Sequence, residues 1–343
     1  MKLSIVATLY RSEKHLREFY ERITRVAQGI TDDFELILVN DGSPDGSLSI
    51  ARELHEKDAR VVVLDLSRNF GHHKAALTGV SYALGETVFL IDSDLEEPPE
   101  LLGRFWRELH SDPELDVVFG VQQVRRGEGF NRLAGSWFYK VFNALSDHKI
   151  VENEVIARLM TRRYVDSLIR FREADPVLAG LCSLAGFNRK AIPMLKGQRR
   201  ETSYDLGRKV SMVVRSVTSF SAKPLIMIFY LGATISLASF LYVLTLVIQK
   251  LVLGCTIEGW ITIAASIWLL GGLILFSLGV IGIYVAMIFN QVKNRPLTIV
   301  RQQWRRPVDF QPNRQPAEHP IASTDPANPG AASINYSEET AHK

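Results

Sequence analysis

Residues 88–99, VFLIDSDLEEPP, decide the fold. The run Val88–Ile91 is apolar and too short for a helix, which is typical of a strand buried in a parallel sheet. It leads directly into Asp92 and Asp94, and the two prolines that close the stretch prevent the strand from continuing. The sequence therefore places two carboxylates at the carboxyl end of a buried strand, where open α/β sheets bind their ligands.

This pair of carboxylates suits a hard divalent cation that keeps some of its waters and shares the phosphate oxygens of a substrate. We predict Mg²⁺ or Mn²⁺ on Asp92 and Asp94. The same pattern also occurs as an acidic turn that caps the next helix, so the surrounding sequence has to decide between the two.

Around this stretch, apolar runs of strand length alternate with segments of helical spacing. Strand and helix alternate four times in about ninety residues, which predicts an α/β fold with a mostly parallel sheet and crossover helices. Besides the strand before Asp92, we expect strands at Leu3–Thr8, Phe34–Val39, Val61–Leu66 and Val117–Val121, and helices at Glu13–Ala27, Ser47–Glu56, Ala75–Leu84 and Leu101–Leu109.

The composition limits the class of protein. The 343 residues leave room for one core-bearing domain of about 200 residues and a further part. A formal net charge of +3 does not indicate a nucleic-acid partner. A mean hydropathy of +0.05 alongside 22% charged residues means that apolar residues are concentrated in part of the chain. Cys182 and Cys255 lack metal-ligand spacing, and the short N-terminal apolar run is not expected to be a signal peptide.

These apolar residues are concentrated in two long uncharged segments. No charged residue occurs between Lys223 and Lys250 or between Glu258 and Lys293, and each segment exceeds the roughly 20 residues that cross a bilayer. We predict a hairpin of two transmembrane helices at about 225–249 and 260–289. Basic residues flank the outer ends, so the positive-inside rule predicts that both ends of the hairpin face the cytoplasm.

The segments on either side of the hairpin have their own character. Residues 203–223 mix basic and apolar residues, which indicates either an amphipathic helix on the membrane surface or an ordinary surface helix. Residues from about 307 are rich in Pro, Ala, Ser and Asn, and we expect a disordered tail there. The predicted organisation is a cytoplasmic domain at 1–202, a juxtamembrane helix at 203–223, two membrane helices within 224–292, and a basic segment with the tail at 293–343.

Polar residues also follow the second and third expected strands. Asp41 lies in a turn rich in capping residues, where it either accepts a hydrogen bond from a nucleobase N–H or caps the following helix. Arg68 either contacts phosphate or ribose or forms a surface salt bridge. His72 and His73 are adjacent and therefore project differently, and we do not expect them to bind a metal.

Four blocks occur in order: SIVATLYRSEKHL, LVNDGSPDGS, SRNFGHHKAALTGVSYALGE and FLIDSDLEEPPELL. Together they resemble the domain of glycosyltransferase family 2. SFSAKPL before the apolar segments, and GVIGIYVAMIFNQVKNRPLTIV at their end, are similar to the polyprenyl-phosphate glycosyltransferases of that family. The resemblance covers roughly residues 3–305. It implies a nucleotide-binding GT-A-like domain, a divalent metal, inverting transfer of one sugar from a nucleotide sugar to a lipid phosphate, and a homotetramer, for which no single residue gives an argument.

The resemblance also implies roles for matching positions. Asp41 corresponds to the acid that contacts the base, and Asp92 and Asp94 correspond to the pair that contacts ribose and metal. Arg158 matches an arginine near the acceptor and the phosphates. The predicted nucleotide site comprises Thr8, Tyr10, Asp41, Arg68, Lys74 and Asp92, and the predicted acceptor-phosphate site comprises Arg126, Arg158, Arg200, Ser203 and Tyr204.

The chain departs from the family's pattern at three places. Glu96 stands where the family usually has Gln, Ile156 and Ala157 stand where it often has Asp-Phe, and Glu201 stands at a usual Gly. These departures bear on the sugar and on the contacts with the acceptor, and they leave the carboxylate pair intact.

A lipid phosphate acceptor would explain why arginines are needed, because its negative charge lies next to the charge of the donor. Its second pKa is about 6, so near pH 7 it is mostly a dianion and needs little help from a general base. Two unit charges about 4 Å apart repel by about 4 kcal/mol even at an effective dielectric constant of about 20. Arg126, Arg158 and Arg200 are predicted to offset this repulsion, or else form exposed salt bridges. Glu96 or Asp94 could assist as a base, and neither is assigned.

These features predict an enzyme of the inner (plasma) membrane that makes a polyprenyl-phosphate-linked monosaccharide, with undecaprenyl phosphate as the acceptor. A processive polysaccharide synthase is one alternative, although it would normally need more membrane helices to form a channel. A catalytically inert membrane scaffold that binds a nucleotide is the other, and it predicts binding without turnover.

Overall fold

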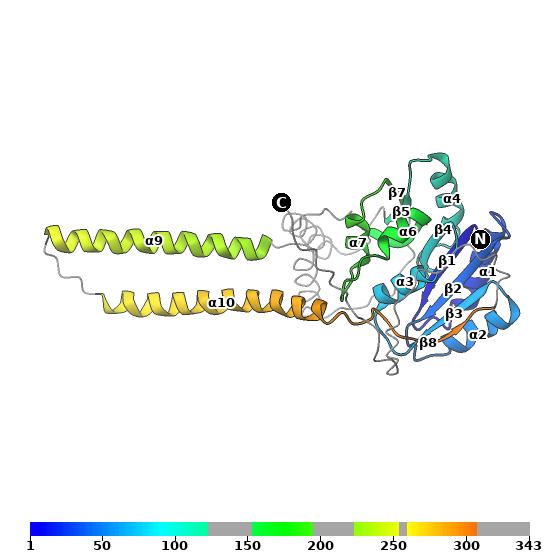
Figure 1. Ribbon diagram of the computed structural model, residues 1–343, viewed down its shortest axis with the longest axis horizontal. Coiled ribbons are helices and arrows are strands. Elements are labelled where there is room, and N and C mark those ends of the chain that lie inside the picture. The colour runs from blue at the N-terminus through cyan, green and yellow to red at the C-terminus, as the bar shows by residue number, and fades with distance from the viewer. Residues whose placement is uncertain (123–152, 195–222, 254–258, 307–343) are drawn as a thin grey trace, which may run out of the picture. The chain divides into compact units, whose positions relative to one another are not determined.

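The computed structural model describes residues 1–122, 153–194, 223–253 and 259–306, and its strands form one sheet in the order β7-β5-β6-β4-β1-β2-β3-β8 (Figure 1). β1 pairs in parallel with β2 and β4, and β2 with β3. β6 lies antiparallel between β4 and β5, and β8 lies antiparallel on β3. The strands are β1 Leu3–Leu9, β2 Phe34–Asn40, β3 Val61–Leu66, β4 Thr87–Asp92, β5 Val117–Gln122, β6 Glu154–Thr161, β7 Arg189–Met194 and β8 Val300–Trp304.

Helices cover both faces of this sheet, which explains why its central strands are apolar at nearly every position. In β1, Ile5 and Ala7 belong to one buried cluster, and Val6 belongs to the cluster on the other face. The helices of the first face are α1 Leu16–Gln28, α2 Ser47–Lys57 and α4 Leu101–Ser111, and those of the second are α3 His72–Ser81, α6 Arg162–Leu168 and α7 Leu178–Leu184.

The order of the strands places a ligand-binding crevice. The chain passes from β1 outward through β2 and β3, and then crosses to β4 on the other side of β1. The connections therefore leave β1 and β4 in opposite directions. In such doubly wound sheets, ligands bind outside the carboxyl ends of the two strands at this reversal. Asp92 ends β4, so the α/β fold and this position for the carboxylates are as the sequence predicts.

Some elements differ from those expected. α3 begins at His72 and not at Ala75, because Gly71 with φ +100° takes the backbone conformation that starts the helix early. β6 and β7 were not predicted. β8 lies within residues 293–343, for which a basic segment and a tail were expected. The tail from residue 307, and nearly all of the expected amphipathic helix at 203–223, lie outside the described residues.

Two long apolar helices follow, α9 Lys223–Leu253 and α10 Trp260–Val292 (Figure 1). Within the described residues, Leu270–Val292 is the one stretch long and apolar enough to cross a membrane, with a mean hydropathy of 2.4. α9 contributes the shorter apolar stretch Leu225–Ile235. The predicted hairpin of two transmembrane helices therefore remains a proposal.

Candidate active site

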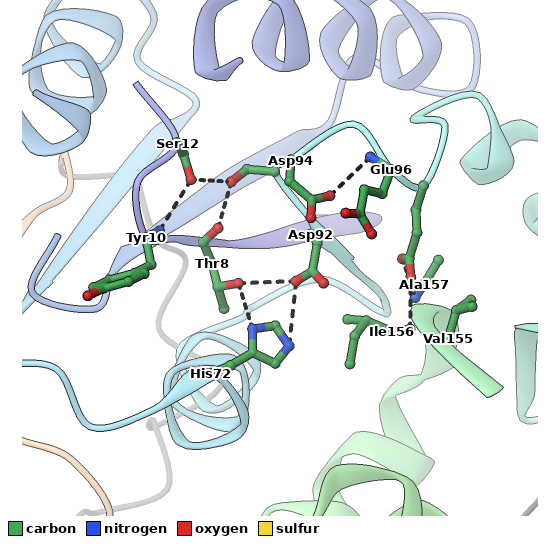
Figure 2. A network of polar contacts seen from close by, with 12 residues as sticks. Thr8, Tyr10, Ser12, His72, Asp92, Asp94, Glu96, Val155, Ile156 and Ala157 are labelled. Atoms are coloured by element: carbon green, nitrogen blue, oxygen red, sulfur yellow. Dashed lines mark hydrogen bonds and ion pairs between the residues drawn. The ribbon is translucent and has the colours of Figure 1, made fainter. Parts of the chain in front are cut away.

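The candidate site lies where β1 and β4 end side by side. Thr8 is the register partner of Asp92, so the two side chains point to the same face of the sheet. Thr8 Oγ1 donates to Asp92 Oδ1 at 3.2 Å and lies 3.2 Å from His72 Nδ1 (Figure 2). His72 is the first residue of α3, and its Nε2 lies 3.5 Å from Asp92 Oδ1. Thr8 thus ties Asp92 to the end of β1, and the start of α3 lies beside both residues.

Ser93 points to the opposite face and fixes the loop to β1. Its side chain is buried, and Oγ lies 2.7 Å from Thr8 O and 2.9 Å from Ser12 Oγ. Ser12 Oγ in turn accepts a hydrogen bond from Tyr10 N at 3.2 Å (Figure 2). The buried Ser93 fixes the turn that follows β4, and in the same turn Asp94 is exposed next to half-buried Asp92.

Glu97 anchors the other end of the loop. It is fully buried, and its carboxylate accepts hydrogen bonds from Ile156 N at 3.1 Å and Ala157 N at 2.8 Å, at the start of β6 (Figure 2). Between the two anchors, Asp94 is exposed, and its Oδ1 accepts a hydrogen bond from Glu96 N at 3.0 Å. The loop therefore presents Asp92, Asp94 and Glu96 from a backbone fixed on both sides.

The donor set fits a divalent cation that a substrate helps to hold. Among the residues that the structure describes, no group of three or more His, Cys, Asp or Glu side chains is placed to bind a metal by itself. Mg²⁺ is usually bound by one or two carboxylates together with substrate phosphates and water. Exposed Asp94 and half-buried Asp92 supply such a partial set.

A second wall of the crevice forms where two loops interlock. Asp41 is buried, and its carboxylate accepts hydrogen bonds from Phe70 N at 2.7 Å and Gly71 N at 3.1 Å. Gly42 has φ +59°, and a Cβ on it would lie 2.5 Å from Asn69 N. The turn at residues 40–43 and the loop at residues 67–71 are therefore in backbone contact at the carboxyl ends of β2 and β3.

Comparisons with known proteins fit this geometry. The family model "Glycosyl transferase family 2" matches residues 4–172, which hold β1 to β6 and the carboxylate loop. A Mycobacterium tuberculosis protein named as a glycosyltransferase is 44% identical over 302 residues, which are 88% of this chain and 88% of that protein. The chain belongs to glycosyltransferase family 2.

Two further proteins are similar to this glycosyltransferase. The bactoprenol glucosyl transferase of Shigella phage SfII is 31% identical over 308 residues, which cover 89% of this chain and 99% of the phage protein. A crystal structure of glucosyl-3-phosphoglycerate synthase from Mycobacterium tuberculosis, in complex with Mn²⁺, UDP and glucosyl-3-phosphoglycerate, matches with a TM-score of 0.47 at 19% identity. That match covers 64% of this chain and 79% of the crystallised one.

The structure brings part of the predicted nucleotide site of the glycosyltransferase together. Thr8, Asp41 and Asp92 all lie at carboxyl ends of neighbouring strands. Tyr10 follows β1 with 48% of its surface exposed, and the guanidinium of Arg11 lies over its ring, 5.6 Å from the centroid. Arg68 lies over the ring of Phe70, 4.1 Å from its centroid, and its NH1 donates to Asn69 O. Lys74 pairs with Asp175 at 2.9 Å.

Arg158 differs from its predicted role as a direct phosphate contact. Only 1% of it is exposed, and its guanidinium donates to Val155 O, Ile156 O and Cys182 Sγ. Glu154 Oε1 lies 3.4 Å from its NH1. Arg158 is paired with Leu90 in β4 and points into the core, so its guanidinium is not exposed to a phosphate in this arrangement. Arg126, Arg200, Ser203 and Tyr204 lie outside the described residues.

The charge of Arg158 affects the pKa values of the two histidines of the site. Burial alone would lower the pKa of Arg158, but Cys182 and Glu154 raise it, so the guanidinium stays charged. Burial lowers the pKa of His72, and it lowers that of His73 to about 4, with the charge of Arg158 acting in the same direction. Both imidazoles are therefore neutral at pH 7.

Two residues of the site were missed by reasoning from the sequence. His72 was considered only as a metal ligand, whereas it contacts Thr8 and Asp92. Glu97 was passed over because nothing in the stretch EEPP distinguishes it from Glu96. Only the fold shows that Glu97 turns inward to meet β6.

Proposed function

We propose that this glycosyltransferase transfers a single sugar from a nucleotide sugar to a polyprenyl phosphate at the cytoplasmic face of the plasma membrane. The observation that carries the proposal is the position of Asp92 and Asp94 at the strand reversal, on a loop fixed to β1 and β6. The name of the phage relative, a bactoprenol glucosyl transferase, supports a polyprenyl acceptor.

The donor nucleotide is assigned to the wall formed by residues 40–43 and 67–71. Asp41 stands at the carboxyl end of β2, where it would meet a base N–H, although its oxygens now accept two backbone N–H groups. A carboxylate oxygen has two lone pairs, so a further hydrogen bond to a base is compatible with those contacts. Tyr10 and Lys74 would complete the site, with Lys74 exchanging Asp175 for a phosphate.

The diphosphate is assigned to the side of the crevice where Asp92 and Asp94 lie. Mg²⁺ or Mn²⁺ bound by these carboxylates would neutralise the charge that develops on the leaving nucleoside diphosphate. Thr8 keeps Asp92 in place by its hydrogen bond, and neutral His72 lies beside both side chains. Arg158 is buried and paired with Glu154 beneath the site, so it is not assigned a contact with the substrate.

The acceptor phosphate is already a nucleophile near pH 7, because it is mostly a dianion. Its main requirement is relief from repulsion by the donor, and we assign this task to Arg126, Arg200, Ser203 and Tyr204 as well as to the cation. Glu96 extends the negative edge of the loop, beside Asp94.

The membrane part is proposed to be a hairpin made by α9 and α10, with the catalytic domain in the cytoplasm. Large apolar side chains on both helices are solvent-exposed, among them Phe229 at 69% and Leu275 at 71%. Soluble monomers rarely expose continuous apolar surfaces of this size, whereas a bilayer would cover them. Anchoring holds the active site at the plane where the phosphate of a polyprenyl lipid lies.

The proposal is tested with the full chain in lipid nanodiscs that contain undecaprenyl phosphate. Radiolabelled UDP-, GDP- and dTDP-sugars are supplied in turn, and label is measured in the organic extract and identified by mass. One sugar per lipid is expected from one of the donors. A polymeric product, or nucleotide binding without any transfer, would contradict the proposal and support a processive synthase or an inert scaffold, respectively.

A further inference from the structure

The chain that leaves α10 returns to the catalytic sheet and closes its edge. β8 pairs with β3 in antiparallel register, with Val63 opposite Trp304 and Leu66 opposite Val300 (Figure 1). Just before β8, Ile299 O accepts a hydrogen bond from Ser67 N at 2.9 Å. Ser67 begins the loop at residues 67–71, so one wall of the proposed nucleotide site is attached to the segment that follows the apolar helix.

Arg301 of β8 makes an ion pair with a buried carboxylate of β3. Its Nε and NH2 both donate to Asp65 Oδ2, at 2.8 and 2.6 Å. The Asp65 side chain is only 2% exposed, whereas that of Arg301 is 60% exposed. The other oxygen of Asp65 accepts a hydrogen bond from Asn40 Nδ2 at 2.8 Å. A carboxylate buried to this extent depends on both partners, because an unpaired buried charge is costly.

Asn40 links Asp65 to the turn at residues 40–43. Its Oδ1 accepts a hydrogen bond from Ser43 N at 3.3 Å, across the turn that contains Asp41 and Gly42. With a carboxylate on one side and an N–H on the other, the Asn40 amide satisfies both partners in one orientation only. The series Arg301, Asp65, Asn40 and Ser43 thus runs from the strand after α10 to the proposed nucleotide turn.

We infer that Arg301 is a positioning residue for nucleotide binding, acting through Asp65 and Asn40 on the turn at residues 40–43. The inference rests on the proposed function, which supplies the nucleotide. Without the guanidinium, Asp65 keeps only its Asn40 partner among the described residues, and a shift of its carboxylate toward solvent alters that hydrogen bond. The donor site therefore includes a residue that lies after the membrane helices, some 236 positions from its partner.

The residue directly after β8 offers a control. Arg305 NH1 donates to Glu35 Oε2 at 2.9 Å, and the Glu35 side chain is likewise 2% exposed. Glu35 Oε1 accepts hydrogen bonds from Ser4 Oγ and Leu84 N, near the amino ends of β1 and β4. This network lies at the opposite end of the strands from the crevice. Arg305→Gln therefore removes a more buried ion pair, together with the hydrogen bond to Tyr82 O, and loosens the end of β8 without reaching the turn.

The test measures binding of radiolabelled UDP, GDP and dTDP to the full chain with Mg²⁺ in detergent, together with thermal denaturation. For the nucleotide that binds, Arg301→Gln should raise Kd about five- to thirtyfold. Arg301→Lys should recover part of the loss, because it restores the charge. Transfer at saturating donor should retain its kcat, so that the defect appears in KM. Arg305→Gln should leave Kd within about twofold of the wild type, even though its melting temperature falls.

Two results would overturn the inference while leaving the proposed function standing. Either Arg301→Gln binds nucleotide as the wild type does, or Arg305→Gln weakens binding equally, in which case β8 only stabilises the fold. If the wild-type chain binds none of the three nucleotides, the proposed function itself is refuted, and this inference with it.

Discussion

Gly42→Ala should impair sugar transfer far more than it impairs folding. Gly42 has φ +59°, which costs an L-residue about 1–2 kcal/mol. The new Cβ would also lie 2.5 Å from Asn69 N and 2.6 Å from Arg68 C, where ordinary contact begins at 3.4 Å. Both are backbone atoms that no side-chain rotation can move. The turn at residues 40–43 and the loop at residues 67–71 must therefore separate by about 0.9 Å.

A displacement of about 1 Å at an active site can reduce the rate about a hundredfold. We expect a loss of this size in kcat/KM for the donor, measured as label transferred to undecaprenyl phosphate. Gly186→Ala is the matched control, because Gly186 also has a left-handed φ, +72°, but nothing lies within 4 Å of its added Cβ. It should lower the melting temperature slightly and leave transfer unchanged. If Gly42→Ala and Gly186→Ala transfer sugar equally well, the two loops do not form the nucleotide site.

Three other perturbations have defined outcomes. Glu97→Gln turns an NH₂ group toward Ile156 N or Ala157 N, and should destabilise the fold by about 1–3 kcal/mol and reduce transfer. Glu100→Gln breaks only the exposed pair with Arg22 and should cost less than about 1 kcal/mol in the same thermal denaturation; equal losses would contradict the role of Glu97. Burial lowers the pKa of His73 from 6.5 to about 4, so between these values the unfolded chain binds a proton that the folded chain does not. The free energy of unfolding should therefore reach its full value above about pH 6.5 and fall by on the order of 2–3 kcal/mol toward pH 4. His73→Gln should flatten this pH dependence, and an unchanged slope would exclude His73 as its source. Asp175→Asn releases Lys74 and should tighten nucleotide binding by up to about fivefold in equilibrium dialysis, whereas Lys74→Gln should weaken it; the same sign for both variants would refute the competition.

The central strands could be predicted almost to the residue. Val88–Ile91 and Phe34–Val39 are apolar because helices cover both faces of the sheet, and this burial is visible in the sequence as continuous apolar runs. The boundaries of β2 and β4 differ from those expected by one residue at each affected end. The order of strands and helices then suffices to place Asp92 at the carboxyl ends of the parallel strands.

The antiparallel additions could not be predicted in this way. β6 carries Glu154 and Arg158, which make it resemble a polar loop, because the two charges neutralise each other only in the folded core. Arg301 lies in β8 and Arg305 directly after it, and the sequence pattern indicates for both only charges that flank a membrane helix. Their partners, Asp65 and Glu35, lie more than two hundred positions away, beyond the reach of any local pattern.

In the candidate site, too, some residues could be predicted from the sequence and others could not. Thr8, Asp41 and Asp92 were predictable because each stands at the end of a strand. The role of Glu97 depends on which way a side chain turns in a loop, and that of His72 depends on the helix beginning at Gly71. Arg158 was assigned to a phosphate by its place in a motif, whereas its pairing with β4 directs it into the core.

The role of the Asp92 and Asp94 carboxylates is tested most directly by the rate of single-sugar transfer to undecaprenyl phosphate. This rate is measured for Asp94→Asn and for the wild type with and without EDTA. Asparagine keeps the shape of the side chain and removes the charge that a divalent cation requires. The variant should lose at least about a hundredfold in rate, and the wild type should lose a similar amount once divalent ions are removed. Undiminished transfer by Asp94→Asn would contradict the claim that this carboxylate pair carries the reaction.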